Sequence, residues 1–148
     1  MVRSWDLLLR PSFVRQAGGY SAAMAVVEYQ DLPLAGKDRR WDGDAAEKRV
    51  RAWAGAEDKP NERFRKAFLW YDEKAPDKFG SYKFPIADVI RGQLKAVPRA
   101  IIAAAAVIDG ARGGAKIPPE DIPRIKAHLA KYYEKMGEQP PWEKKKAI

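Results

Sequence analysis

The sequence predicts an α+β protein in which a small antiparallel sheet with a hairpin is packed by three or so helices. Two observations indicate the helices. Residues 42–54 and 118–137 carry apolar side chains at helical spacing, and residues 98–108 form an Ala-rich stretch that starts at a proline. A third indicates the sheet, because short apolar runs separated by turn residues fill much of the chain between these helices.

The first helix is expected to begin after Asp42 or Asp44, whose carboxylates accept hydrogen bonds from the free amides of a helix start. Gly55 is expected to end it, and residues 59–62 form a turn that starts a short helical segment. The buried stripe of the first helix follows the i, i+4, i+7 spacing and consists of Ala46, Val50 and Trp53.

The strands follow this helix. Residues 67–71 are an apolar and aromatic run suited to a central strand. Residues 82–87 predict a second strand, in which Pro85 lacks an amide hydrogen and so belongs at an edge or a bulge. Residues 88–97 predict a hairpin of two short strands around a turn at Arg91-Gly92.

Two further helices complete the prediction. Pro98 suits a first helical turn, and residues 99–108 hold only Ala, Ile and Val beyond Arg99, so this helix is expected to be buried on several sides. The last helix starts near the acids at residues 120–121 and ends at Gly137. Its predicted buried stripe is Ile122, Ile125, Leu129, Tyr132 and Met136.

We therefore expect three segments. Residues 1–29 form an N-terminal arm, loosely packed, and residues 30–137 form a single compact α+β domain. Residues 138–148 are a basic tail rich in Pro and Lys, which we expect not to pack as an element.

Composition excludes several functional classes. The 148 residues include no Cys and one His, which leaves no disulfide, thiolate nucleophile, Cys-ligated metal or multi-His metal site. No apolar run approaches the length needed to cross a bilayer, so no membrane partner is expected. The four Ser residues lie in no nucleophile elbow, and no Gly-rich stretch has the spacing of a phosphate loop. The sequence thus predicts no enzyme activity and no cofactor, although a carboxylate-only metal site stays open.

Charge is the strongest functional signal. Lys and Arg number 28 against 20 Asp and Glu, a formal net charge of +8, and residues 111–148 are the basic pole. Each Lys or Arg placed against a phosphate displaces a condensed counterion, so this excess favours a nucleic-acid partner. The alternative is that the excess charge only keeps the protein soluble.

Eleven residues are candidates for phosphate contact. Arg124, His128, Lys131 and Lys135 follow i, i+4, i+7, i+11 and form one basic, unpaired stripe along the last helix. The remaining candidates are basic residues of the first helix, the hairpin, the Ala-rich helix and the Gly-rich link: Lys48, Arg51, Arg91, Lys95, Arg99, Arg112 and Lys116. If they share one surface, they form a phosphate track that does not read base sequence.

Aromatic residues alternate with basic ones in residues 64–68 and 132–135, a pattern compatible with base stacking on single strands. The core interpretation is preferred, because a chain of this size needs these rings for its interior. Trp41, Tyr133 and Trp142 are the better candidates for exposed rings.

Several segments together resemble an uncharacterised domain of tailed-phage and prophage genes that accompanies head-assembly genes, including prohead proteases. The resemblance covers roughly residues 30–137. Its segments are Leu32-Pro33-Leu34-Ala35, Trp41-Asp42, residues 49–54, 67–71, 82–89 and 96–100, the Ala-rich helix and residues 128–133. It implies a viral origin and phage head proteins as further partners, and it supplies no catalytic residues.

The expectation is therefore a non-enzymatic phage-type protein that binds DNA, double- or single-stranded, through the phosphate backbone with little sequence preference. The alternative is a capsid-assembly or scaffold-like module whose partners are proteins. With no secretory signal or transit peptide recognised, we expect the host cytoplasm or the virion. The absence of Thr and the single Asn are typical of a thermophilic source, and a GC-rich genome would produce the same bias.

Overall fold

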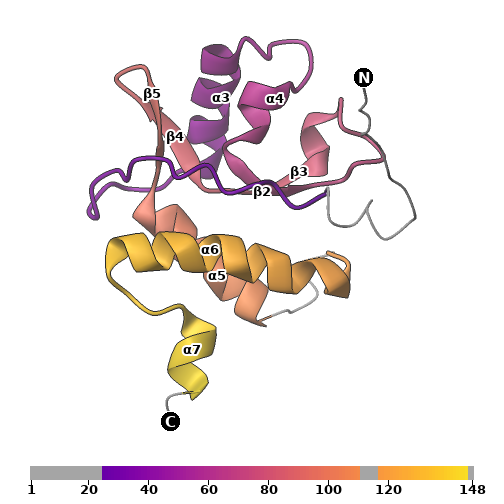
Figure 1. The fold of residues 1–148 in the computed structure, drawn as a ribbon. Helices are drawn as coiled ribbons and strands as arrows, with labels where there is room; N and C mark the ends of the chain where they lie inside the picture. Colours follow the sequence, from indigo (N-terminus) through magenta and orange to yellow (C-terminus); the bar gives the residue numbers. More distant parts are fainter. Residues whose placement is uncertain (1–24, 111–116, 147–148) are drawn as a thin grey trace, which may run out of the picture.

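The computed structural model describes residues 25–110 and 117–146 and arranges them in three layers (Figure 1). Two helices, α3 (Gly43–Ala54) and α4 (Glu62–Arg65), lie on one side of the strands. Two others, α5 (Pro98–Gly110) and α6 (Ile122–Met136), lie on the other side. The middle layer holds β2 (Phe68–Tyr71) and β3 (Tyr82–Pro85), and the hairpin of β4 (Ala87–Ile90) and β5 (Gln93–Ala96) rises beside α3. The short elements are η1 (Phe79–Ser81), η2 (Pro119–Asp121) and α7 (Pro141–Lys146). The predicted α+β class is confirmed.

The strands form two separate antiparallel pairs, β2 with β3 and β4 with β5. β2 is buried along its whole length. The reason is that Phe68 and Tyr71 pack into the hydrophobic cluster under α3 and α4, whereas Leu69 and Trp70 pack into the cluster with α5 and α6. On its far edge β2 meets Val26 through an isolated bridge to Trp70.

The predicted hairpin is confirmed. Asp88 pairs with Lys95 and Ile90 with Gln93 across β4 and β5. The two turn residues, Arg91 and Gly92, have φ of 54° and 79°, and two successive positive φ angles make the type I′ turn that matches strand twist. Arg91 is exposed at this turn.

The predicted start and end of the first helix are also confirmed, and so is the short helical segment after the turn at residues 59–62. The Asp42 side chain accepts a hydrogen bond from the Ala45 amide at 3.2 Å, and Gly55 ends α3 with φ of 68°. Asn61 caps α4, because its Oδ1 accepts from the Phe64 amide at 2.9 Å while its Nδ2 donates to the Ala54 carbonyl at 2.8 Å. Asn61 thereby joins the end of α3 to the start of α4.

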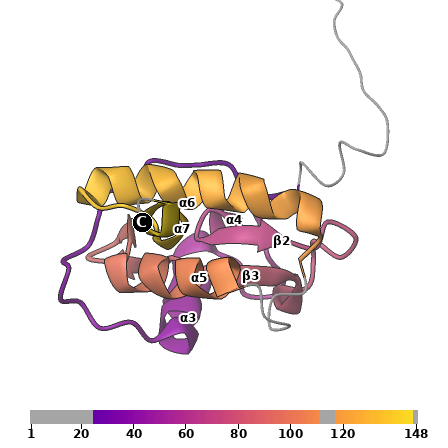
Figure 2. The ribbon, with the colours of Figure 1, turned by 90° about the horizontal axis from the view of Figure 1, so that it is seen from below.

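The prediction that α5 is buried on several sides is wrong for one face. The side chains that meet α6 and the strands are buried, among them Ala100, Ile101 and Ala105. On the opposite face Ile102 is 51% exposed and Val107 43% exposed. Figure 2 shows why: α5 has α6 and α7 beside it, and no other described element covers its outer side.

The start and end of the domain extend beyond the predicted limits. Ala25 and Val27 belong to the predicted arm, but both are buried in the core. Residues 1–24 of that arm lie outside the described residues. The prediction for the tail is wrong, since residues 141–146 form α7. Trp142 on α7 packs with its ring 6.4 Å from that of Tyr133.

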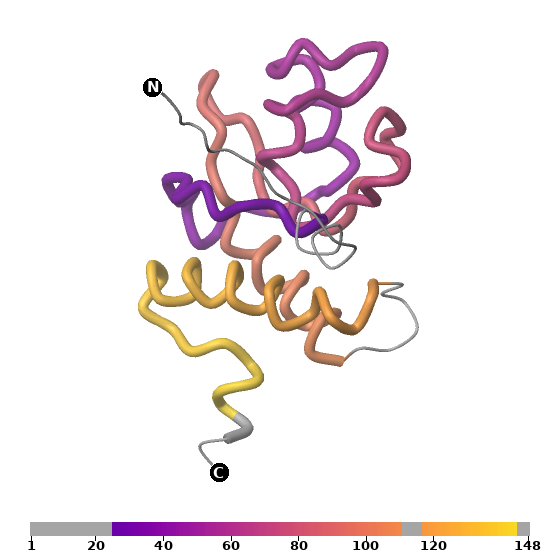
Figure 3. Tube along the Cα trace, turned by 45° about the vertical axis from the view of Figure 1, so that its right-hand side comes forward, coloured from indigo at the N-terminus to yellow at the C-terminus, as the bar shows by residue number. Residues whose placement is uncertain are grey.

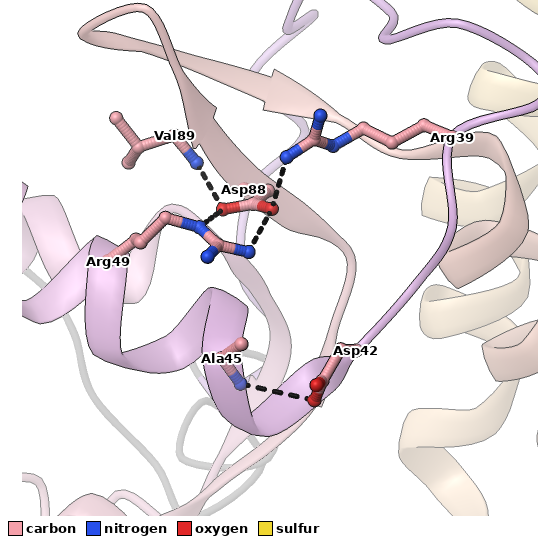
Figure 4. A network of polar contacts seen from close by, with 6 residues as sticks. All are labelled: Arg39, Asp42, Ala45, Arg49, Asp88 and Val89. Atoms are coloured by element: carbon pink, nitrogen blue, oxygen red, sulfur yellow. Dashed lines mark hydrogen bonds and ion pairs between the residues drawn. The ribbon is translucent and has the colours of Figure 1, made fainter.

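A buried carboxylate ties the hairpin to α3. Asp88 on β4 is 2% exposed, and it accepts hydrogen bonds from Arg49 at 2.8 and 2.9 Å and from Arg39 at 3.1 Å (Figure 4). The amide of Val89 donates a further bond at 2.7 Å. Burial alone would raise the pKa of Asp88, but the bonds from Arg49 and Arg39 hold it below its usual value.

We expect Asp88→Asn to destabilise the protein by about 2 kcal/mol, because the amide leaves two guanidinium groups without their counter-charge. Urea unfolding at neutral pH measures the change. Asp38→Asn, at an exposed position with the same loss of charge, is the control and should change stability by less than about 0.5 kcal/mol. Equal unfolding midpoints for the two variants would contradict the structural role of Asp88.

Candidate nucleic-acid interface

A cleft of about 750 Å³ opens between α4, α6 and the chain segment at residues 26–30. This volume lies in the range of sites that hold small molecules. The side chains on its walls are mostly basic, acidic or aromatic: Glu28, Tyr29, Gln30, Glu62, Arg65, Lys66, Tyr71, Arg124, His128 and Lys131, with Val26, Val27 and Ala127 as the apolar remainder.

The floor of the cleft is a strap, residues 25–32, that runs along α6 (Figure 3). Three side chains one turn apart on α6 hold it. His128 Nδ1 lies 2.8 Å from the Val27 carbonyl oxygen, the Tyr132 hydroxyl accepts from the Leu32 amide at 3.2 Å, and Lys135 donates to the Leu32 carbonyl at 2.8 Å. On its other side the strap is fixed to β2, since the Val27 amide donates to the Leu69 carbonyl at 2.8 Å.

The α4 wall is anchored by Phe64. Its ring is fully buried and packs against those of Phe68 at 4.8 Å and Tyr82 at 5.4 Å. With Phe64 pointing inward, the next two residues line the cleft. The Arg65 guanidinium lies over the Tyr71 ring, 4.3 Å from its centroid, so it is held in place by a cation–π contact.

The α6 wall follows from helical geometry. Ile125, Leu129 and Tyr132 are fully buried, which turns the adjacent stripe with Arg124 and Lys131 toward the cleft. Lys131 Nζ lies 5.1 Å from the centroid of the Tyr29 ring.

His128 lies at the base of this wall and is only 6% exposed. Burial lowers its pKa to about 4 even though the bond to Val27 favours the charged form, so the ring is neutral at pH 7. In the neutral ring Nδ1 carries the hydrogen that it donates to the carbonyl, which leaves Nε2 as an acceptor. Nε2 has no partner among the described residues and is not a fully buried atom, and His128 borders the cleft.

Tyr29 completes the floor. Its ring meets that of His128 edge-on at 5.6 Å and that of Tyr132 at 4.8 Å. Its hydroxyl donates to the Asp31 carboxylate at 2.8 Å. Burial and this bond raise the pKa of Tyr29 well above its usual value, so the hydroxyl stays protonated.

Four cations, Arg65, Lys66, Arg124 and Lys131, line the cleft without an ion pair to any carboxylate in the described part of the chain. Two carboxylates, Glu28 and Glu62, share the walls and are likewise unpaired there. The cleft therefore offers a net positive charge together with hydrogen-bond acceptors.

The predicted stripe on α6 is brought to the cleft only in part. Arg124 and Lys131 line it as exposed cations. His128 borders it but adds no charge, because burial keeps it neutral. The prediction that Lys135 is unpaired is wrong, since its Nζ forms an ion pair with Asp31 at 2.9 Å and holds the strap.

The structure does not bring the other predicted cations to the cleft. Lys48 is exposed on α3, and the Arg51 guanidinium lies 3.4 Å from the centroid of the Phe79 ring, half-buried. Arg91 and Lys95 belong to the hairpin, which extends on the opposite side of the strands from α6, and Arg99 is exposed at the start of α5 (Figure 1). Arg112 and Lys116 lie outside the described residues. One continuous track through all the described candidates is therefore not formed.

Sequence reasoning missed the α4 wall and the strap. The signal for Arg65 and Lys66 is the alternation of basic and aromatic residues in 64–68. The preferred interpretation assigns the rings of this segment to the core and gives its cations no role. That interpretation is right for Phe64 and Phe68, both buried, and it overlooks the two cations between them. The prediction of three exposed rings is wrong, because Tyr133 is buried and Trp41 and Trp142 are half-buried against the core.

Comparisons with protein-family models, with curated proteins and with solved structures find no match for this chain. Within residues 25–110 and 117–146, no helix has the length and apolar character needed to cross a membrane. The same residues contain no group of three or more His, Asp or Glu side chains arranged to hold a metal ion.

The neutral His128 makes stability depend on pH. Its folded-state pKa of about 4 lies below the value near 6.5 expected in the unfolded chain, so the unfolded state takes up the proton first. Stability is therefore lost as pH falls from about 6.5 to about 4, by about 3 kcal/mol from this group.

We expect wild-type protein to lose about 3 kcal/mol more than His128→Gln between pH 7 and pH 4 in urea unfolding experiments. Glutamine has no titrating group there and can still donate to the Val27 carbonyl. Parallel pH profiles for the two proteins would show that His128 is not held neutral.

Proposed function

We propose that this protein binds nucleic acid, with the phosphates held between α4 and α6 and with no reaction catalysed. The observation that carries the proposal is the convergence of Arg65, Lys66, Arg124 and Lys131 on one cleft from two elements far apart in the chain. Within the part of the chain that the structure describes, these cations have no carboxylate partner, so their charge stays available for a polyanion, and binding gains free energy from counterion release. Phosphate contacts position a strand but carry no base sequence, so little sequence preference is expected.

The proposed interface uses fewer cations than the eleven candidate residues of the sequence. Some of the cations are neutralised by neighbouring carboxylates. Arg39 and Arg49 are paired with Asp88, and Lys135 is paired with Asp31. The cations of the cleft are a subset that remains available. The resemblance to an uncharacterised tailed-phage domain that accompanies head-assembly genes is compatible with this function and adds no residue to it.

A protein-interaction module for capsid assembly is the second candidate. One observation favours it, the exposed apolar face of α5 with Ile102 and Val107. Apolar side chains that lie together on a surface mark protein contacts more often than nucleic-acid contacts. A gel-shift titration at low salt separates the two functions, because an unmoved nucleic-acid band favours the assembly module.

We expect the double variant Arg124→Gln/Lys131→Gln to weaken nucleic-acid binding and to make the plot of log K against log salt shallower by about 1.5, the contribution of two phosphate contacts. Fluorescence anisotropy at several salt concentrations measures both. Both positions are exposed, so folding should be unaffected.

The matched control is Lys37→Gln/Lys59→Gln, which removes the same charge at two exposed positions outside the cleft. It should leave the salt slope unchanged. Equal losses in the two double variants would mean that net charge, not the cleft, determines binding. Binding that persists undiminished at half-molar salt would contradict the electrostatic mechanism itself.

A further inference from the structure

We propose that the nucleic acid taken by this cleft is single-stranded, and that the cleft contacts the Watson–Crick edge of an unpaired base as well as the backbone. This inference rests on the proposed function and adds to it the strand type and a contact that phosphates cannot supply. Three features of the cleft carry it: its acceptors, its flat surfaces and its shape.

The acceptors are unexplained by phosphate binding. Glu28 and Glu62 on the walls and His128 Nε2 at the base all accept hydrogen bonds, and none has a side-chain partner among the described residues. A phosphodiester is itself only an acceptor and is repelled by carboxylates. A cleft that served the backbone alone would gain from losing these groups.

Unpaired bases supply the missing donors. Each of the four bases carries at least one N–H group on its Watson–Crick edge, and in a duplex those hydrogens are used in pairing. Single-strand binding proteins commonly contact these edges once bases are splayed out. Because every base has such a donor, acceptors of this kind favour single strands without selecting a sequence.

The flat surfaces are in place beside the acceptors. The Tyr71 ring is buried, with Arg65 over it and the Tyr82 ring stacked on it at 5.3 Å, so it only holds Arg65 in place. The flat groups left for a base are the Arg65 guanidinium and the half-buried Tyr29 ring, with Lys131 beside the latter. Guanidinium planes and aromatic rings both stack bases, and such stacking tolerates any sequence.

The shape gives the third argument. A cleft of about 750 Å³ between two helices has room for an unpaired base that a flexible strand turns inward. A duplex is a stiff cylinder with its bases stacked in the interior, and it presents only phosphates and groove edges to a protein. It cannot bring an unpaired edge to His128 at the base of the cleft.

The test compares three fluorescein-labelled probes of about 12 nucleotides, a length within known single-strand site sizes. They are oligo(dT), an abasic strand with the same backbone, and a dA·dT duplex, measured by anisotropy with the full-length protein at low salt. We expect oligo(dT) to bind at least about fivefold tighter than the abasic strand and the duplex. Equal affinity for all three would overturn this inference and leave the proposed function standing, whereas no binding of any probe would overturn both.

Glu28→Met is expected to change the affinities for oligo(dT) and for the abasic strand in opposite directions. Glu28 is exposed and makes no side-chain bond in the described structure, so the variant should fold. If the carboxylate accepts from a base, the variant binds oligo(dT) about threefold more weakly while it binds the abasic strand more tightly, because a repulsive charge is gone. Tighter binding of both strands would overturn the base contact.

The control for this variant is Glu57→Met, which removes the same charge at an exposed position outside the cleft. It should shift both strands equally and only slightly. A loss of oligo(dT) binding in Glu57→Met as large as in Glu28→Met would also overturn the contact, since it would show that the effect does not come from the cleft.

Discussion

The site depends on one set of contacts, those by which α6 holds the strap at residues 25–32. His128, Tyr132 and Lys135 bind the backbone of Val27 and Leu32, and β2 binds the same strap from its other edge. The Val27 carbonyl is buried and must be paired, and the bonds to Leu32 satisfy the amide and carbonyl of a second strap residue. Without the strap, α4 and α6 would face each other across a gap with no floor, and Tyr29 would not be present between them.

Local features of the fold were predictable because local physics determines them. The Asp42 and Asn61 caps, the Arg91-Gly92 turn and the glycines after α3 and α6 each act within a few residues. The division of the strands into two pairs was not predictable, because it depends on helices that pack on both faces. The exposed face of α5 was missed for a related reason: an all-apolar helix shows no periodicity that tells which side is left uncovered.

The α6 side of the candidate site was predictable from the sequence, and the rest was not. Helical spacing placed Arg124 and Lys131 on one stripe, and both line the cleft. The same spacing could not show that Asp31, about a hundred residues away in sequence, neutralises Lys135, nor that the strap covers His128. Such long-range pairings arise only when the chain folds, and a sequence pattern contains no information on which distant acid meets which cation.

Net charge alone is therefore a poor guide to function in this protein. Asp88 draws two arginines into a structural network, and Asp31 pairs with Lys135. What remains at the cleft is a small group of cations beside carboxylates and a neutral imidazole, which is a mixed surface and not simply a positive one. A mixed surface is costly for a bare polyanion and favourable for a ligand that carries both phosphates and donors. The acids in the cleft thus constrain the proposed ligand more tightly than does the excess of lysine and arginine over the whole chain.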